Sequence, residues 1–466
     1  MVTPSRTRTQ STVTRIDADP AHRPSRPCPP GDHPPPGRGL PALDRGRARA
    51  QGVLVGHDLL GGSFVHDPFE LYAAGVVSNP NMIVFGQIGR GKSAFVKSYL
   101  WRQAVFGRRA WVVDPKGEYR ALAAAWGARP IDLRPGGTVR LNPLDPGPSD
   151  ESGRRAGGRT DGAAAPDRRQ AEVLASLAAA CLGRPLLPRE RAACDLALAA
   201  VSRARGVPTL PVVVDALLDP SAEAASAVRT DRAALLEDGR DVALELRRLV
   251  HGDLRGMFDG ETTPGLDLGG PFVGLDLAAL YDSPALGVLM ACATAWLQAT
   301  LARQAAAGTG AHVLVVVDEA WAVLANLGVA KWLQASWKLS RAYGVANVAV
   351  LHRLSDLQAV GAAGSQQVGL ATGLLADSET RVVYAQAPGE VAAATDLLSL
   401  SESEAAALPQ LRRGVALWKV GRRSFLVRHV LSPHERAIVD TDRAMATAAP
   451  SRAYGRAREG KGGART

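Results

Sequence analysis

Cysteine is scarce in this 466-residue chain, and long hydrophobic runs are missing from it. The four cysteines, Cys28, Cys181, Cys194 and Cys292, lack the spacing of a metal site and indicate a reducing compartment rather than a disulfide framework. The longest apolar run, 284–297, holds about 14 residues, whereas a membrane-spanning helix needs about 20. The sequence therefore predicts no transmembrane segment, and its polar, Arg- and Pro-rich N-terminus does not predict a secretory signal.

Excess charge is also missing from the central part of the chain. The formal net charge is +10, but residues 1–50 carry nine Arg against four Asp, and residues 451–466 carry five basic residues against one Glu. The 400 residues between them are therefore close to neutral. An extended basic surface for nucleic acid is not predicted there. The two basic tails could contact nucleic acid or an acidic membrane surface, or they could simply be solvated.

The most informative motif present is a phosphate-binding loop of the form GxxxxGK[ST]. It follows the apolar run 82–85, which predicts a buried strand, and it opens the segment 92–106, which predicts a helix. Successive backbone N–H groups of such a loop surround an anion, and the helix N-terminus adds partial positive charge. The Lys reaches the β- and γ-phosphates, and the Ser hydroxyl binds Mg²⁺. With ATP and Mg²⁺ as ligands, the predicted binding residues are Gly86, Gln87, Ile88, Gly89, Arg90, Gly91, Lys92 and Ser93.

A second apolar run ends in the acidic residues that this chemistry needs. Five consecutive aliphatic residues at 313–317 are followed by Asp318 and Glu319, which a parallel strand would deliver to the carboxyl edge of the sheet. By analogy with other P-loop enzymes, Asp318 would hold Mg²⁺, usually through water, and Glu319 would polarise the attacking water. The alternative is a strand that ends in a solvated Asp-Glu pair.

Two further strand ends hold polar residues beside this predicted site. His352 follows the apolar run 345–351, and a neutral imidazole there could sense the γ-phosphate or bond the lytic water. The alternative is a surface histidine at a strand end. In the sequence DPKGEY, Asp114 could support Mg²⁺ or the lysine of the loop, whereas we expect structural roles for Lys116 and Glu118, in an ion pair and a helix cap.

Hydrophobic patterns divide the chain into an α/β sheet domain and an inserted helical region. Short β-branched runs, most of the early ones continuously apolar, are typical of central strands covered on both faces. The segment 169–250 is instead Ala- and Leu-rich with helical spacing. Strands are predicted at 82–85, 110–113, 272–275, 312–317, 345–351, 381–385, 415–420 and 425–430, and a further helix is predicted at 332–343. The predicted divisions are a disordered tail (1–50), the first part of a P-loop ATPase domain (51–146), a flexible linker (147–168), an all-helical insertion (169–265), the second part of the ATPase domain (266–435) and a flexible tail (436–466).

Three motifs together resemble one protein family. They are Asp114-Pro115-Lys116-Gly117-Glu118-Tyr119, Leu141-Asn142-Pro143-Leu144-Asp145 and Asp318-Glu319-Ala320-Trp321. This set is similar to the ATPase domain of the VirB-four/TraC family of conjugative type IV secretion systems, over roughly residues 52–430. The DPKGE sequence alone is shared with the coupling-protein ATPases of the same systems. The resemblance implies a RecA-like P-loop fold of the HerA/FtsK branch, with a mainly parallel central sheet interrupted by the helical insertion.

The resemblance also implies a homo-hexamer in which ATP lies between subunits and a neighbour's arginine completes the site. Arg341 and Arg381 are the candidates, although either could be an ordinary surface arginine. The family commonly has Gln where this chain has His352, and it carries a large N-terminal docking domain, whereas 50 residues precede the motifs here. The implied partners are proteins of the secretion membrane complex. The implied location is cytoplasmic, with peripheral attachment at the inner face of the cell membrane left open.

Three functions remain open from the sequence. The leading one is a Mg-dependent ATP hydrolase that powers assembly of, or substrate transfer through, a conjugative type IV secretion system. The second is a HerA/FtsK-like or coupling-protein-like motor on duplex DNA, which the near-neutral central region weakens. The third is a nucleotide-gated scaffold with negligible turnover, against which the presence of Glu319 counts.

Overall fold

A computed structural model describes residues 52–145, 168–204, 207–266, 270–281, 312–324, 327–352 and 366–440, with scattered positions of a helix between 286 and 301. The predicted tail at 1–50, nearly all of the predicted linker at 147–168 and the residues from 441 onward lie outside this described part. Most of the apolar run 284–297 lies outside it as well. Within the described residues, no helix combines the length and the hydropathy that crossing a bilayer requires.

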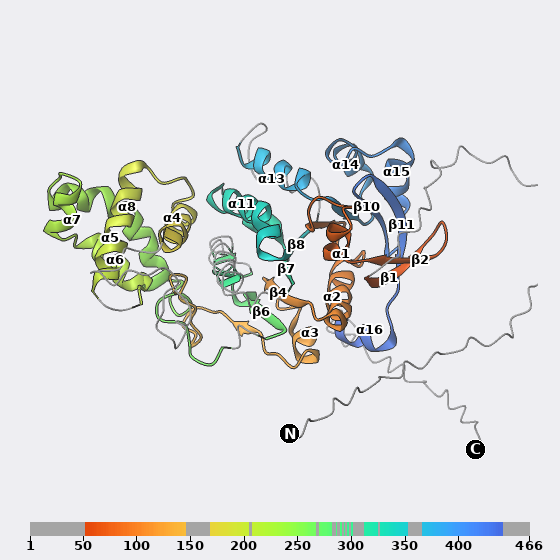
Figure 1. The fold of residues 1–466 in the computed structure, drawn as a ribbon, viewed down its shortest axis with the longest axis horizontal. Coiled ribbons are helices and arrows are strands. Elements are labelled where there is room, and N and C mark those ends of the chain that lie inside the picture. Colours follow the sequence, from red (N-terminus) through yellow and green to blue (C-terminus); the bar gives the residue numbers. More distant parts are fainter. Residues whose placement is uncertain are drawn as a thin grey trace, which may run out of the picture. The chain divides into compact units, whose positions relative to one another are not determined.

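An 11-stranded sheet forms the centre of the described fold (Figure 1). Its strand order is β2-β1-β11-β10-β9-β3-β8-β7-β4-β6-β5. Pairing is parallel from β9 through β5 and antiparallel from β9 to β2. The strands are β1 (Val53–Asp58), β2 (Ser63–His66), β3 (Met82–Phe85), β4 (Arg109–Asp114), β5 (Ile131–Asp132), β6 (Phe272–Asp276), β7 (Val313–Val317), β8 (Val345–Leu351), β9 (Thr380–Val383), β10 (Val415–Val420) and β11 (Arg423–His429).

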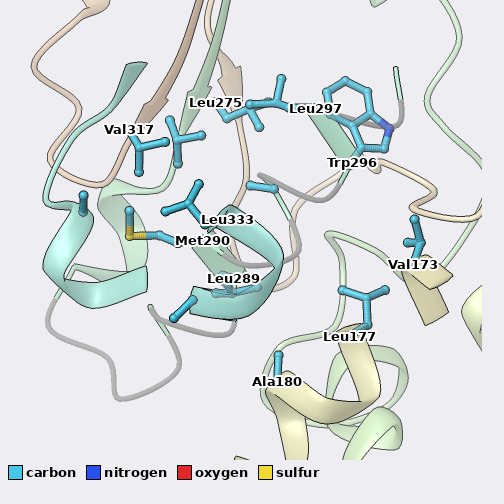
Figure 2. Packing of buried hydrophobic residues seen from close by; sticks show 14 of the residues in the cluster. Val173, Leu177, Ala180, Leu275, Leu289, Met290, Trp296, Leu297, Val317 and Leu333 are labelled. Carbon is cyan, nitrogen blue, oxygen red and sulfur yellow. The ribbon is translucent and has the colours of Figure 1, made fainter. Parts of the chain in front are cut away.

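The parallel strands are buried on both faces, as their continuously apolar sequences predict. In β3, Ile83 and Phe85 belong to one hydrophobic cluster, whereas Met82 and Val84 belong to a second. Successive side chains of a strand point to opposite faces, so the two clusters lie on opposite sides of the sheet. Figure 2 shows part of the first cluster, in which Leu275 of β6 and Val317 of β7 lie near Leu333 of α11. The predicted α/β sheet with two covered faces is therefore confirmed.

Helices of the described part cover the sheet and form a group of their own. α5, α6 and α8 pack against one another, and α4 contacts both α8 and α11 (Figure 1). The helices are α1 (Pro68–Ala73), α2 (Lys92–Gln103), α3 (Arg120–Ala125), α4 (Arg168–Leu182), α5 (Pro188–Arg203), α6 (Leu210–Leu218), α7 (Ala222–Ala227), α8 (Arg232–Val250), α10 (Ala320–Leu324), α11 (Leu327–Tyr343), α13 (Gln366–Ala376), α14 (Val391–Leu398), α15 (Glu402–Ala407) and α16 (Pro433–Val439).

The structure differs from the sequence-based expectations at several element boundaries. The strands β1 and β2 were not predicted, and α11 begins at Leu327 rather than at residue 332. The C-terminal tail was expected to begin at residue 436, but this position lies inside α16. The side chains of Ser432 and Glu435 form a capping box at the start of α16, and Val439 at its end is buried. The Ser-x-x-Glu spacing is a sequence signal of such a helix start.

Candidate functional site

Three glycines give the predicted phosphate-binding loop its backbone conformation. Gly86 has φ +153°, Gly89 has φ +76° and Gly91 has φ +107°, all in a region that favours glycine. A Cβ atom on Gly86 would lie 2.4 Å from Cβ of Tyr384, because the residue after β9 packs directly against the loop. Gly91 is the N-cap of α2, which begins at Lys92 as the sequence predicted.

Lys92 lies folded against this loop. Its Nζ donates to the carbonyl oxygens of Gly86 and, at 3.1 Å, Gln87. The same Nζ lies 3.2 Å from Nδ1 of His352. Ser93, the next residue in the first turn of α2, is half-buried. The lysine and hydroxyl predicted to meet phosphate and metal therefore both lie where the helix begins.

The acidic residues lie at the carboxyl ends of β4 and β7, which are neighbours in the sheet. Asp318 is buried and accepts hydrogen bonds from the hydroxyl of Tyr119 at 3.1 Å and from the backbone N–H of Glu319 at 3.0 Å. Asp114 accepts from the backbone N–H groups of Lys116 and Tyr119. Burial raises the pKa of both carboxyls, that of Asp114 to about 6, because the charged form loses hydration.

Glu319 has an unusual backbone and a fully engaged carboxylate. Its φ is +51°, which is uncommon for a residue other than glycine and is often found at functional sites. Oε1 accepts from Nε2 of His352 at 2.6 Å and pairs with Nζ of Lys116, whereas Oε2 accepts from Nε1 of Trp321 at 2.6 Å. Burial alone would raise the pKa of Glu319, but its hydrogen bonds and charge interactions with His352 and Lys116 outweigh this and lower the pKa to about 2.

His352 connects the phosphate-binding loop with Glu319. It follows β8, which pairs with β3 on one side and with β7 on the other. Its Nε2 contacts Glu319, so the tautomer that carries hydrogen on Nε2 donates there and leaves Nδ1 to accept from Lys92. The structure thus places Lys92, Glu319 and His352 in one hydrogen-bonded group. Their catalytic roles remain predictions.

Lys116 is the site residue whose environment the sequence reasoning missed. Structural roles in an ion pair and a helix cap were expected for Lys116 and Glu118. Both residues do form ion pairs, but Lys116 pairs with the predicted general base Glu319, and Glu118 pairs at 3.1 Å with Lys97, which is buried in α2. The contact between Lys116 and Glu319 could have been predicted from the position of DPKGEY directly after a strand, but only once β4 is known to lie beside β7.

The two candidate trans arginines have different surroundings. Arg341 lies in the last turn of α11 and is exposed. Arg381 lies on β9, between β3 and β10, and its guanidinium donates to the carbonyl oxygens of Ser378 at 3.0 Å and Leu375 at 3.1 Å. These bonds hold Arg381 within its own chain, at the end of α13. The geometry therefore shows a structural contact for Arg381, and the trans role stays a prediction for both arginines.

The described residues fit a magnesium ion that is held largely by nucleotide phosphate. Among these residues, no cluster of three or more His, Cys, Asp or Glu side chains could hold a metal alone. P-loop enzymes instead combine the loop hydroxyl with phosphate oxygens and a carboxylate at the second strand. Ser93 and Asp318 match that pattern. The hydrogen bonds that Asp318 accepts from Tyr119 and from the backbone of Glu319 come from neutral groups, which leaves its charge available to a cation.

Comparisons with known proteins support this fold. No protein-family model matches the chain, and no curated protein matches it. Among solved structures, VirB4 of Thermoanaerobacter pseudethanolicus is 21% identical, with a TM-score of 0.64, and the match covers 82% of this chain and 98% of that one. The fold is similar to that of VirB4.

The bacterial conjugative coupling protein TrwB is also similar to this chain. One TrwB structure has a TM-score of 0.51 and 17% identity, covering 82% of this chain and 90% of that one. The complex of TrwB with ADP and Mg²⁺ has a TM-score of 0.52 at 17% identity, covering 82% and 91%. At these identities the comparisons establish the fold alone. They confirm the RecA-like P-loop architecture and, at the level of fold, the resemblance to VirB4.

Proposed function

We propose that this chain is a Mg-dependent ATP hydrolase that powers assembly of, or substrate transfer through, a conjugative type IV secretion system. The single observation that carries the proposal is the hydrogen-bonded group formed by Lys92, His352 and Glu319. This group links Lys92, which we propose binds phosphate, to Glu319, which we propose activates water. The fold similarity to VirB4 supports the cellular setting.

In the proposed reaction, the loop binds the phosphates of ATP and Lys92 leaves its carbonyl partners to meet the β- and γ-phosphates. Mg²⁺, held through Ser93 and Asp318, would supply positive charge against the charge that develops on the phosphoryl group. Glu319 accepts a proton from a water molecule whose oxygen attacks the γ-phosphorus. The bond between the γ-phosphorus and the β,γ-bridging oxygen breaks, and the products are ADP and inorganic phosphate.

Assembly as a homo-hexamer would complete this site. Charge on the transferring phosphoryl group favours an added cation, and an exposed arginine of a neighbouring subunit can supply it. Arg341, which is exposed, and Arg381 are the two candidates. The partners that we infer are proteins of the secretion membrane complex at the cytoplasmic face of the membrane, with the basic tails as candidate contacts for nucleic acid.

A second candidate function is translocation of duplex DNA by the same chemistry. The fold similarity to the coupling protein TrwB favours it. The near-neutral charge of the chain between its tails counts against it, because a DNA channel needs Lys and Arg to neutralise phosphates.

Steady-state ATP hydrolysis by the purified chain, with and without duplex DNA, tests the proposal. The Glu319→Gln variant serves as the blank for contaminating activity. Turnover that is indifferent to DNA supports the secretion ATPase, whereas strong stimulation that is lost at high salt favours the DNA motor. No turnover above the blank in either condition, with ATP bound, would leave the nucleotide-gated scaffold as the function.

A further inference from the structure

We propose that Lys116 is a second phosphate-binding lysine, whose ammonium group pairs with Glu319 in a resting state and pairs with the γ-phosphate of ATP when ATP is bound. The inference rests on the proposed function and adds a residue to it. Nζ of Lys116, which follows β4, pairs with Oε1 of Glu319, which follows the neighbouring strand β7.

The carboxylate of Glu319 is closed to water in this arrangement. Oε1 is shared by His352 and Lys116, and Oε2 is occupied by the indole N–H of Trp321. The side chain is 2% exposed. A carboxylate whose two oxygens are both occupied by donors of its own chain is a poor base, because no water molecule can reach it. One partner has to leave before an attacking water can be bound.

Lys116 is the partner that can leave at the smallest cost. If the Lys116 ammonium group moves away, the buried carboxylate of Glu319 keeps its hydrogen bonds to His352 and to Trp321. The Lys116 side chain is 26% exposed and carries its charge on a flexible four-carbon stem. Its Nζ also lies 5.4 Å from the centre of the Tyr281 ring.

The destination of the Lys116 ammonium group follows from its position relative to Lys92. Nζ of Lys116 lies 3.4 Å from Nε2 of His352, and Nζ of Lys92 lies 3.2 Å from Nδ1 of the same ring. A single imidazole therefore separates the two ammonium groups. A terminal phosphate that draws Lys92 from the loop carbonyls comes within reach of Lys116, and its charge competes with that of Glu319.

This arrangement makes release of Glu319 depend on the γ-phosphate. ADP binds the loop and Lys92 but has no γ-phosphate to pair with Lys116, so Lys116 stays paired with Glu319. The γ-phosphate of ATP pairs with Lys116 instead, which leaves Oε1 of Glu319 free to bind water. The predicted signature is a contribution of Lys116 to the affinity for triphosphate that is absent for diphosphate.

Equilibrium binding of ADP and of the non-hydrolysable imido analogue of ATP, each with Mg²⁺, tests this role without requiring turnover. We expect Lys116→Met to weaken binding of the ATP analogue by ~10-fold or more, the scale of a lost charge-assisted hydrogen bond, with ADP affinity unchanged. Lys116→Arg, which keeps the charge, should restore part of the loss. Arg120→Gln is the matched control, because Arg120 belongs to the same segment but pairs with Asp276 at 2.6 Å rather than with Glu319.

Equal effects of Lys116→Met on both nucleotides, or no effect on either, would overturn the proposal and leave Lys116 as a structural partner of Glu319. If Lys116→Met does not fold, the analogue-to-ADP affinity ratio of Lys116→Arg decides, since it should differ from that of the unmodified chain while Arg120→Gln leaves it unchanged. An unmodified chain that binds neither nucleotide would overturn the proposed function itself, and the role of Lys116 with it.

Discussion

The indole nitrogen of Trp321 lies 2.6 Å from Oε2 of Glu319, two residues earlier in the chain. This contact fixes one oxygen of the carboxylate while His352 and Lys116 share the other. It is made possible by the left-handed backbone of Glu319, after which α10 begins at Ala320. The sequence DEAW is therefore a geometric unit in which the tryptophan orients the acid.

Trp321→Phe tests this orientation. The variant keeps an aromatic ring but loses the N–H donor, so Glu319 should sample other directions. We expect ATP turnover to fall by about 10-fold, because one hydrogen bond to a charged group contributes about 1.5–3 kcal/mol. Affinity for ADP should not change. Steady-state kinetics with a parallel ADP titration measures both, and an unchanged turnover would show that the indole does not orient the base.

Glu319→Gln and Lys92→Ala should separate chemistry from binding. Glu319→Gln removes the proposed general base and is expected to cut hydrolysis by ~10²-fold or more while ATP still binds. Lys92→Ala removes the ammonium group proposed to bind phosphate and should weaken nucleotide binding itself. Titration with a fluorescent ATP analogue, alongside a phosphate-release assay, distinguishes the two. Wild-type turnover by Glu319→Gln would mean that another residue is the base.

His352 should tolerate glutamine better than alanine. A glutamine amide can donate to Glu319 and accept from Lys92, which reproduces both contacts of the imidazole, whereas alanine makes neither. We expect His352→Ala to lower turnover by about 10-fold or more and His352→Gln to retain most of it. Comparing the two variants in one hydrolysis assay checks the bridging role. Equal losses in both would argue for chemistry that only an imidazole can perform.

The glycine at the start of the phosphate-binding loop should be irreplaceable for a steric reason. A methyl group on Gly86 would collide with Tyr384, so Gly86→Ala is expected to abolish nucleotide binding. Gly89→Ala is the control, because space at that position is open and only its φ of +76° opposes a side chain, at a cost of about 1 kcal/mol. Isothermal titration with ADP tests the pair. Similar affinities in both variants would contradict the steric argument.

Asp114 should make stability depend on pH. Burial raises the pKa of its carboxyl from 3.8 to about 6, so between these values the folded state binds more protons than the unfolded state. The contribution of this group is present below pH 4 and is lost as pH rises through 6. We expect the free energy of unfolding of the unmodified chain, relative to Asp114→Asn, to fall by about 2–3 kcal/mol from pH 4 to pH 7. Urea unfolding across this range measures it; a constant difference would contradict the shift.

Residue patterns were sufficient to predict much of the fold and the centre of the site. The runs 82–85, 313–317 and 345–351 are continuously apolar, and each became a buried parallel strand. Their carboxyl ends then meet by geometry, which brings Lys92, Glu319 and His352 together. The short strands β1 and β2 lack this signal, since exposed and buried positions mix along them.

The contacts of Lys116 and Arg381 could not be predicted, because they depend on strand order. β4 lies beside β7, although about 200 residues separate them in the chain, and only that neighbourhood brings Lys116 to Glu319. β9 lies between β10 and β3, and the hydrogen bonds of Arg381 to Ser378 and Leu375 follow from the position of that strand beside the end of α13. Sequence periodicity indicates that a segment is a strand and does not say which strand lies next to it.

β8 fixes the spacing between the predicted phosphate-binding loop after β3 and the acidic pair after β7. Its residues Val348 to Leu351 pair with all of β3, while Val345 to Ala349 pair with all of β7. Insertion or deletion of one residue in β8 would therefore reverse the facing of its side chains and displace both neighbours at once. The spacing between the loop and the acidic pair can therefore change only if β3, β8 and β7 change together.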